Sequence, residues 1–442
     1  MHRVISSTAL KEVNAAAAAA PGKLRERVLT AYTEAARDWS SAPLRIAQAL
    51  RSMRELHSRE RRFVGEAVYG MIRWRRRLAF VALGTEEAPA LALYLAWLSS
   101  EGGVFDEAAL NEGRLDARRL RTPDAFIDEI ADPQTRLGVR HSLPNWLVAR
   151  LDDAYGDETE ALCAALNQRA PLVVRANLLK NTREQLLAAL EKEKVTAQPL
   201  ALAPLALVLD QRLNAFGLAA FTDGRFEVQD AGSQLIAELC APPPRGVVVD
   251  ACAGAGGKTL ALGALLGNRG RITSLDVSRK KLDELRDRAR RAGLTNQRAF
   301  AIDEAQPLAT ISDLVGAADR VLCDAPCSGI GALRRNPEAR WRLTPDELAA
   351  MPAKQRHILD GYAPLVRVGG RLIYATCSIL PEENDAVAEA FLAAHPGFVE
   401  MPAKEILGAA RAAELGDGKR LRLLPHRHDS DGFFAAVFRR TV

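Results

Sequence analysis

Apolar residues along the second half of the chain form short runs that end in small turn residues. Three such stretches stand out, and they are Val247–Thr259, Val321–Gly331 and Leu372–Pro381. Apolar runs that break into Gly or Cys turns are typical of parallel strands that end at a binding crevice. Amphipathic stretches separate these runs, so the pattern predicts a doubly wound α/β domain over residues 241–442.

The predicted strands and helices of this domain alternate along the chain. We expect strands at Val247–Asp250, Arg271–Asp276, Arg298–Asp303, Arg320–Asp324, Arg371–Thr376 and Gly432–Arg439. We expect helices from the glycine turn to Leu266 and at Ser278–Ala292, Pro345–Val366 and Pro381–Ala394. Strands that alternate with helices in this way favour a mainly parallel sheet covered on both faces.

Residues 22–138 follow a different pattern, with apolar positions at three- and four-residue steps. This spacing predicts an all-α helical domain, with helices at Leu24–Asp38, Ala42–Leu56 and Glu60–Val81. The third helix is apolar on two adjacent faces, which is typical of a helix buried in a bundle. Residues 1–21 contain an alanine tract and are interpreted as a flexible leader.

Residues 139–240 are interpreted as a small α/β linking segment between the two domains. Its predicted strands are Leu172–Leu178, Leu205–Leu209 and Arg225–Asp230, and its helices are Thr182–Lys194 and Ala231–Cys240. A chain of 442 residues exceeds what one compact core accommodates, so several domains are expected.

Composition and charge exclude some classes of protein. The net charge of +5 is compatible with a polyanionic partner without requiring one. The six cysteines show no disulfide framework and no C-x-x-C pair, which favours a reducing, cytoplasmic compartment and argues against a zinc or other metal site. No apolar run approaches the length of a membrane helix, so no membrane partner is expected.

The stretch Cys252–Thr259 (CAGAGGKT) is a glycine-rich turn between a strand and a helix. It fails the Walker A pattern because position 252 is Cys, and it fails the dinucleotide pattern because position 259 is Thr. Such a turn still lets a ligand approach the backbone closely at a helix N-terminus. Asp276 and Asp303 end the next two predicted strands and are placed for a ribose and a base edge, although capping of helices is the simpler alternative for each. Together they predict a nucleoside cofactor.

Two further turns each place one cysteine at the same edge of the predicted sheet. Asp324 and Cys327 follow one strand, and Cys377 follows another. A buried free cysteine is usually a small hydrophobic residue, but these two lie beyond the apolar runs, where ligands bind in this fold class. A thiolate that adds to carbon 6 of a pyrimidine makes carbon 5 nucleophilic, and Asp324 is the candidate acid for the ring nitrogen.

These motifs in this order resemble the S-adenosylmethionine-dependent RNA cytosine-5 methyltransferases of the Sun family. The resemblance rests on CAGAGGKT, DAPCSG and YATCS, with QDAGSQL upstream and PHRHDSDGFFAA downstream, and covers roughly residues 140–442. It implies a Rossmann-like methyltransferase sheet, Cys377 as the nucleophile and Cys327 as an aid to product release. The residues it implies for S-adenosylmethionine are Cys252, Ala253, Gly254, Ala255, Gly256, Gly257, Lys258, Asp276, Asp303 and Asp324. The family's turn is closer to CAAPGGKT, so Gly254 and Ala255 are departures.

The N-terminal part resembles, less strongly, the NusB-type helical RNA-binding domain, chiefly in RRFVGEAVYGMIRWRRRL. Both resemblances together imply an enzyme that acts on 16S ribosomal RNA, and we expect it to be a monomer. The same chemistry on transfer RNA, or a non-catalytic RNA-binding assembly factor with this fold, are the alternatives. Clustered arginines are predicted to contact RNA, with a solvated rim as the alternative. They are Arg73, Arg75, Arg76, Arg77, Arg334, Arg335 and Arg340.

Overall fold

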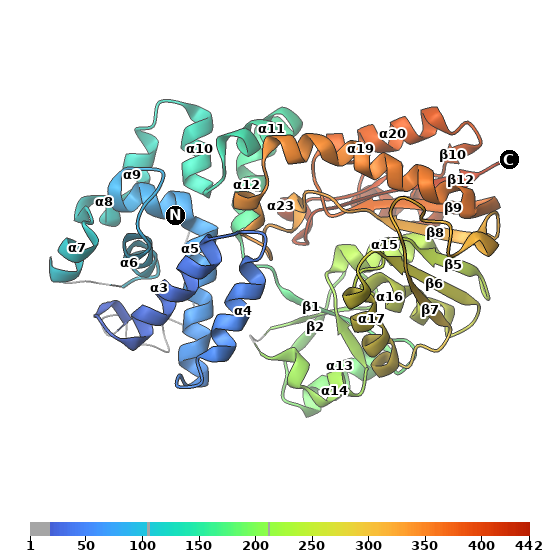
Figure 1. Cartoon of the computed structure of the whole chain (residues 1–442), viewed down its shortest axis with the longest axis horizontal. Coiled ribbons are helices and arrows are strands. Elements are labelled where there is room, and N and C mark those ends of the chain that lie inside the picture. Colours follow the sequence, from blue (N-terminus) through green and yellow to red (C-terminus); the bar gives the residue numbers. More distant parts are fainter. Residues whose placement is uncertain (1–17, 104–106, 211–212) are drawn as a thin grey trace. The chain divides into compact units, whose positions relative to one another are not determined.

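The computed structural model describes residues 18–103, 107–210 and 213–442, and the chain divides into two compact units (Figure 1). The first unit contains the chain up to Gln168 and takes in the later segment Leu333–Pro345. The second contains Arg169–Ala332 and Asp346–Val442. The segment that directly follows the Cys327 turn therefore belongs to the N-terminal unit. The pattern of apolar positions does not indicate that this segment leaves the second unit.

The first unit is all-helical among its described residues, as the spacing of apolar positions predicts. Its helices are α3 (Lys23–Ala36), α4 (Ala42–Ser52), α5 (Ser58–Leu83), α6 (Ala90–Ser100), α7 (Glu107–Gly113), α8 (Ala117–Arg121), α9 (Pro123–Asp128), α10 (Pro133–His141), α11 (Asn145–Tyr155), α12 (Thr159–Asn167) and α18 (Ala339–Arg342). Helix α5 begins with a capping box between His57 and Glu60 and ends at Gly84, whose φ of 73° suits glycine.

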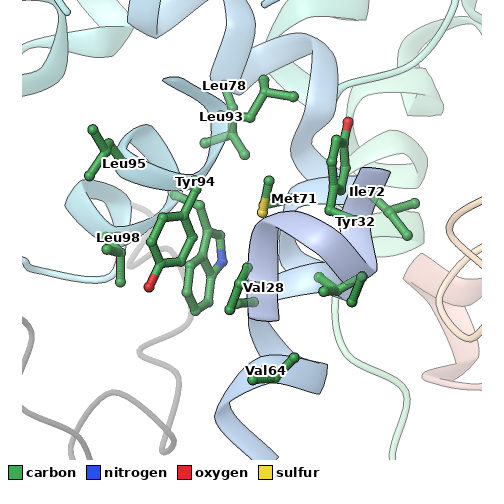
Figure 2. Close-up of a cluster of buried hydrophobic side chains, with 14 of the residues drawn as sticks. Val28, Tyr32, Val64, Met71, Ile72, Leu78, Leu93, Tyr94, Leu95 and Leu98 are labelled. Atoms are coloured by element: carbon green, nitrogen blue, oxygen red, sulfur yellow. The ribbon is translucent and has the colours of Figure 1, made fainter. Parts of the chain in front are cut away.

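Helix α5 lies at the centre of this unit's core (Figure 2). Both of its predicted apolar faces are buried, and Phe63, Val68 and Met71 are each 0% exposed. Trp97 of α6 packs edge-on against Phe63 with ring centroids 5.9 Å apart. Burial of such side chains contributes about 1.5–3 kcal/mol each relative to exposure, so α5 and α6 form the stable centre of the unit.

The second unit begins with a four-stranded antiparallel sheet in the order β2-β3-β1-β4. Its strands are β1 (Leu172–Ala176), β2 (Ala197–Pro199), β3 (Ala206–Leu209) and β4 (Phe226–Val228), with helices α13 (Arg183–Lys192) and α14 (Ala219–Thr222). Helix α15 (Ala231–Cys240) then leads to the larger sheet and has the predicted bounds. This sheet has its own hydrophobic core within the predicted linking segment, whose residues 139–168 belong to the first unit.

The larger sheet has the order β10-β12-β9-β8-β5-β6-β7, with β11 paired to β12. Its strands are β5 (Val247–Asp250), β6 (Arg271–Asp276), β7 (Gln297–Ala301), β8 (Ala318–Asp324), β9 (Val366–Thr376), β10 (Phe398–Glu400), β11 (Leu421–Leu423) and β12 (Phe433–Arg440). Strands β5 to β9 pair in parallel, whereas β12 runs antiparallel to β9. The sheet is therefore doubly wound and mixed.

Alternate side chains of the central strands enter two separate cores. Val248 of β5 packs with α15 and α16 (Gly257–Leu266) on one face, and Val249 packs with α19 (Pro345–Tyr362) and α20 (Asp385–Ala394) on the other. Helix α17 (Arg279–Ala292) packs its apolar side in a further cluster with α16. This two-sided cover explains why the central strands carry apolar side chains on both faces, as Val248 and Val249 do.

Two predicted boundaries are wrong. The helix predicted to reach Val366 ends at Tyr362, and a short 3₁₀ turn leads into β9, which already begins at Val366. Gly369, with a φ of 77°, lies where the pairing of β9 with β8 is irregular. Because of this irregularity, the first residues of β9 do not show the apolar pattern by which a strand is recognised in the sequence. Strand β7 ends at Ala301, so Asp303 lies in the following turn and not at the strand end.

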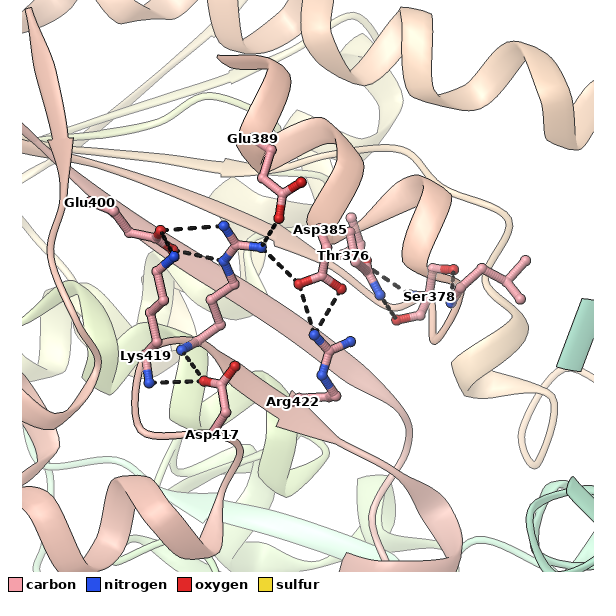
Figure 3. Close-up of polar contacts among 11 residues, drawn as sticks. Thr376, Ser378, Asp385, Glu389, Glu400, Asp417, Lys419 and Arg422 are labelled. Carbon is pink, nitrogen blue, oxygen red and sulfur yellow. Dashed lines mark hydrogen bonds and ion pairs between the residues drawn. The ribbon is translucent and has the colours of Figure 1, made fainter. Parts of the chain in front are cut away.

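A buried arginine joins α20, β10 and the loop before β11 (Figure 3). The Arg420 guanidinium, on a residue 4% exposed, donates to Glu400 Oε1 at 2.7 Å and to Asp385 Oδ1 at 2.7 Å. Arg422 donates to both oxygens of Asp385. Burial favours a higher pKa for Asp385, but the hydrogen bonds from Arg422 and Arg420 outweigh it and the pKa is lowered. The network fixes α20 directly after the Cys377 loop. Among the described helices none is long and apolar enough to span a bilayer.

Candidate active site

The glycine-rich turn joins β5 to α16 and its backbone is held in a left-handed conformation at two positions. Gly256 has a φ of 86°, and a Cβ added there would lie 2.5 Å from Leu285 Cγ. Gly254 has a φ of 54° and would meet no atom within 4 Å. Gly256 is therefore required for packing against α17, whereas Gly254 leaves open space beside the N-terminus of α16, where an electronegative ligand group is favoured.

Asp276 ends β6, as predicted, and its carboxylate supports the glycine turn. Oδ2 accepts a hydrogen bond from Gly254 N at 2.9 Å, and Oδ1 accepts one from Ser278 N at 2.8 Å. A carboxylate has about four acceptor positions. Asp276 thus shapes the turn and keeps acceptor capacity for a ligand hydroxyl.

Asp250, which the sequence reasoning did not single out, lies beneath the turn at the end of β5. It is 1% exposed, and its Oδ2 accepts a hydrogen bond from Thr259 Oγ1 at 2.6 Å. Its Oδ1 is buried without a hydrogen-bond partner in the described structure. Burial raises the pKa of Asp250 to about 6, although the Thr259 hydrogen bond acts against it. An acid at the end of an apolar strand, as in VVVD, is the signal that could have identified it.

The turn and the first cysteine loop are joined by an ion pair. Lys258 Nζ lies 2.5 Å from Asp324 Oδ2, and their side chains are 11% and 27% exposed. Lys258 Nζ also lies 5.7 Å from the centre of the Phe433 ring. Burial acts to lower the pKa of Lys258, but the charge of Asp324 and the hydrogen bond to it prevail and the pKa is raised. A fixed cation and a fixed anion therefore stand at the carboxyl edge of the sheet.

The two predicted cysteines lie side by side. Cys327 Sγ and Cys377 Sγ are 3.3 Å apart, within hydrogen-bond distance for thiols. The hydrogen bond to Cys377 and then burial raise the pKa of Cys327 well above its usual value. Cys377 follows β9 and Cys327 follows β8, so parallel strands bring both to one edge, as the sequence predicts. All six cysteines are free, each within the described residues.

The remaining residues predicted for the cofactor differ in their surroundings. Cys252 is half-buried, and burial, with the charges of Asp324 and Asp250, raises the pKa of its thiol. Ala255 O accepts a hydrogen bond from Arg288 Nη1 at 2.8 Å, and Arg288 is held in turn by the buried Glu227. Asp303 is exposed and caps its own turn by accepting from Ala305 N at 3.0 Å. Contact of these residues with a cofactor stays a prediction.

Three of the seven arginines predicted to contact RNA are buried inside the helical unit, and for these the prediction is wrong. Arg340 is 1% exposed and donates to Asn167 Oδ1 at 2.7 Å and to Ser142 O at 3.1 Å. Arg334 is 3% exposed and Arg76 is 4% exposed. The Arg76 guanidinium donates to Leu143 O and to Asn145 Oδ1. A guanidinium enclosed by protein acceptors has no access to a phosphate.

The other four arginines are half-buried and also contact protein. Arg73 donates to Arg334 O at 2.8 Å, and Arg77 pairs with Asp124 at 2.7 Å. Arg75 pairs with Glu87 at 3.0 Å and lies 5.5 Å from the Trp341 ring centre. These contacts join segment Leu333–Pro345 and the helices of the unit. Contact of the half-buried set, which includes Arg335, with RNA stays a prediction.

The doubly wound sheet with its cofactor-type turn at the carboxyl edge places the protein among Rossmann-like methyltransferases. Residues 237–439 match the model of the family described as 16S rRNA methyltransferase RsmB/F, and residues 143–215 match the RsmF/B-like ferredoxin-like domain. The chain belongs to this RsmB/F family of S-adenosylmethionine-dependent methyltransferases.

Named relatives and solved structures agree with this assignment. The chain is 33% identical to the probable ribosomal RNA small subunit methyltransferase B of Synechocystis over 86% of this chain and 91% of that protein. It is 31% identical to ribosomal RNA small subunit methyltransferase B of Pseudomonas syringae over 86% and 89%. The crystal structure of PH0851 has a TM-score of 0.77 at 27% identity and covers 95% of this chain and 100% of that one. A methyltransferase homologue from Pyrococcus horikoshii has a TM-score of 0.60 at 26% identity, over 70% and 100%.

Proposed function

We propose that this protein methylates carbon 5 of a cytidine in RNA, and that this RNA is 16S ribosomal RNA. The reaction proceeds through a covalent bond between a cysteine and the base. The observation that carries the proposal is the pair of thiols 3.3 Å apart at the carboxyl edge of a methyltransferase sheet. The relatives named as ribosomal RNA small subunit methyltransferases supply the class of substrate. A protein that only bound RNA would need neither thiol.

The glycine turn fits S-adenosylmethionine, which would supply the methyl group. Gly254 opens onto free space at the start of α16, and Asp276, which ends β6 beside it, would accept from ribose hydroxyls. The unpaired Oδ1 of Asp250 adds negative charge beneath the turn, whereas the charge of Asp324 is offset by Lys258. These features, and not only the family relationship, support the cofactor.

The side chains divide the chemistry between them. The Cys377 thiolate adds to carbon 6 of the cytosine, and the electron pair moves through the ring toward carbon 5 and nitrogen 3. Asp324, which is fixed by Lys258, would act as the acid at the ring nitrogen as negative charge develops there. After carbon 5 is methylated, its proton must leave and the carbon 6–sulfur bond must break. Cys327, which lies beside Cys377, would accept that proton once it has lost its own proton to become a thiolate, and Cys377 would leave carbon 6 as a thiolate.

Two cysteine variants test the assignment of roles. Cys327→Ala should form the bond to RNA and stall, giving a protein–RNA complex that survives denaturing electrophoresis in the presence of donor. Cys377→Ala should give no such complex and no methylation. The opposite pattern would exchange the two roles, and no complex from either variant with activity retained would remove the covalent mechanism.

The nature of the RNA is tested separately. Labelled donor should transfer methyl groups to total RNA, and fractionation should place the label in the small-subunit ribosomal pool at 5-methylcytidine. Label in the transfer RNA pool would overturn the ribosomal assignment while leaving the chemistry intact. Absence of transfer to any RNA would favour a non-catalytic assembly factor.

A further inference from the structure

Glu383 is a fully buried carboxylate in the short 3₁₀ turn that follows the Cys377 loop. It is 0% exposed, and both of its oxygens accept hydrogen bonds. Oε1 accepts from Ser328 N at 2.8 Å and from Gln355 Nε2 at 3.0 Å. Oε2 accepts from Ser328 Oγ at 2.5 Å and from Ser378 Oγ at 2.5 Å. All four acceptor positions of the carboxylate are therefore used by neutral donors.

These donors come from the two loops that carry the thiols. Ser328 directly follows Cys327, and Ser378 directly follows Cys377, so one carboxylate holds the neighbour of each cysteine. Gln355, which is 0% exposed on α19, donates also to Pro326 O at 3.1 Å on the other side of Cys327. The Cys327 loop is thus held from both ends.

A carboxylate suits this position better than a neutral acceptor. Hydrogen bonds to a charged acceptor are roughly twice as strong as neutral ones, and a buried charge is retained only where its hydrogen bonds are complete. The backbone adds a second link, because Gly331 N donates to Cys377 O at 3.0 Å. That hydrogen bond joins two main chains, however. It does not by itself fix the direction in which the Cys327 and Cys377 side chains leave the backbone.

We propose that Glu383 is a positioning residue that sets the distance between the Cys327 and Cys377 sulfurs. The inference rests on the proposed two-cysteine mechanism for its consequence in catalysis, but the distance itself is a property of the protein alone. Glu383 touches neither sulfur, so it acts through Ser328 and Ser378.

The distance can be measured chemically with phenylarsine oxide. The reagent condenses with two thiols to give one arsenic bound to both sulfurs, with release of one water and no change in oxidation state. A chelate of this kind forms only where both sulfurs reach one arsenic, and the effective concentration of the second thiol sets its stability. The folded wild-type protein should bind one equivalent tightly, and Cys327→Ala should lose this tight binding.

Three variants separate positioning from a general loss of structure. Glu383→Ala should bind the arsenical at least about tenfold more weakly, because the second thiol loses its fixed place. Glu383→Gln, which keeps a carbonyl acceptor, should recover part of the affinity. Glu227→Gln removes another buried carboxylate, which pairs with Arg288 and Arg291 beside the small antiparallel sheet, and should bind the arsenical as the wild type does.

The catalytic consequence has its own measurement. Glu383→Ala should lower kcat while the KM for the methyl donor stays unchanged, because the glycine turn is not among its contacts. If Glu383→Ala does not fold, the Ser328→Ala, Ser378→Ala double variant removes both hydroxyl donors and takes its place. Arsenical affinity equal to the wild type in these variants overturns the positioning role. Absence of methyl transfer in the wild type with its dithiol intact would overturn the proposed function instead.

Discussion

Lys258 Nζ lies 2.5 Å from Asp324 Oδ2, and this contact joins the turn before α16 to the loop that carries Cys327. A lysine at the N-terminal end of a helix opposes the helix dipole, so its place must be supported by a negative partner. Asp324 is that partner, so the aspartate proposed to act on the cytosine ring also holds the lysine of the glycine turn.

The two halves of this ion pair should not be equivalent. Asp324→Asn leaves a buried ammonium without its counterion, and we expect a loss of about 3 kcal/mol in the free energy of unfolding. Lys258→Met removes the buried charge itself and should cost less, because Asp324 is more exposed to water. Urea denaturation of both variants at pH 7 tests the order, and equal losses would contradict it.

The pH dependence gives an independent check on the same pair. The raised pKa of Lys258 means that the pair stabilises the folded state fully below pH 10.5 and loses this contribution as pH rises through the folded-state value. Without Asp324, burial dominates and the pKa of Lys258 falls below that of the unfolded chain. The stability deficit of Asp324→Asn relative to wild type should therefore shrink between pH 7 and pH 10, and a constant deficit would show that Lys258 stays charged.

Asp276→Ala should weaken binding of S-adenosylmethionine by tenfold or more and leave the two thiols in place. The variant loses the acceptor of Gly254 N as well as that for the ribose, and hydrogen bonds to a charged group contribute roughly 1.5–3 kcal/mol each. Isothermal titration measures the dissociation constant. Asp283→Ala, an exposed carboxylate on α17 paired with Arg286, is the matched control and should bind donor normally. Equal affinities for both variants would remove Asp276 from the cofactor site.

The sequence predicts that Asp276 and Asp324 lie at one edge of the sheet because both stand at strand ends, whereas Asp250, which also ends a strand, was not singled out. Asp250, Asp276 and Asp324 terminate β5, β6 and β8, and the carboxyl ends of parallel strands share one edge. The spacing of apolar residues and the turn residues that follow each strand predict these positions from the local sequence alone. What the sequence cannot predict is which polar side chains pair across long separations, as Glu383 does with Ser328.

The arginines show this limit most clearly. A cluster of arginines with few intervening acids is typical of a phosphate-binding surface, yet the buried Arg340 donates to Asn167 and Ser142, which lie more than a hundred residues earlier in the chain. Backbone carbonyl groups that accept hydrogen bonds from an arginine cannot be recognised from the charged residues in the sequence. Burial of a guanidinium is visible only once the fold brings these carbonyl groups together.

Gly256→Ala and Gly254→Ala should differ in stability. A side chain at position 256 combines a left-handed backbone with overlap onto Leu285 Cγ at 2.5 Å, and we expect a loss of about 2–4 kcal/mol. At position 254 there is no overlap, so the cost should be about 1–2 kcal/mol from the backbone alone. Thermal and urea unfolding measure the difference, and a larger loss at position 254 would contradict the geometry.

Arg340→Ala should unfold the helical unit more readily and not simply weaken RNA binding. It leaves Asn167 Oδ1 and Ser142 O without their donor in a buried place, which costs about 3 kcal/mol. The exposed Arg342 on the same short helix is the control, and Arg342→Ala should change stability by no more than about 0.5 kcal/mol. A stable Arg340→Ala protein with a flatter salt dependence of RNA binding would restore the phosphate-contact interpretation.

Asp250→Asn should make stability less dependent on pH in the acidic range. The pKa of Asp250 is raised to about 6 by burial, above the value near 3.8 of the unfolded chain. The folded state therefore holds a proton that the unfolded state has released between about pH 4 and pH 6, and the wild type loses stability as pH rises through this window, by up to about 3 kcal/mol.

Asparagine keeps an oxygen for the Thr259 hydroxyl and has no charge to bury. Relative to wild type, Asp250→Asn should thus gain stability between pH 4 and pH 7, measured by urea denaturation at both values. A difference that does not change with pH would show that Asp250 titrates normally, and that its buried Oδ1 is solvated in the folded protein.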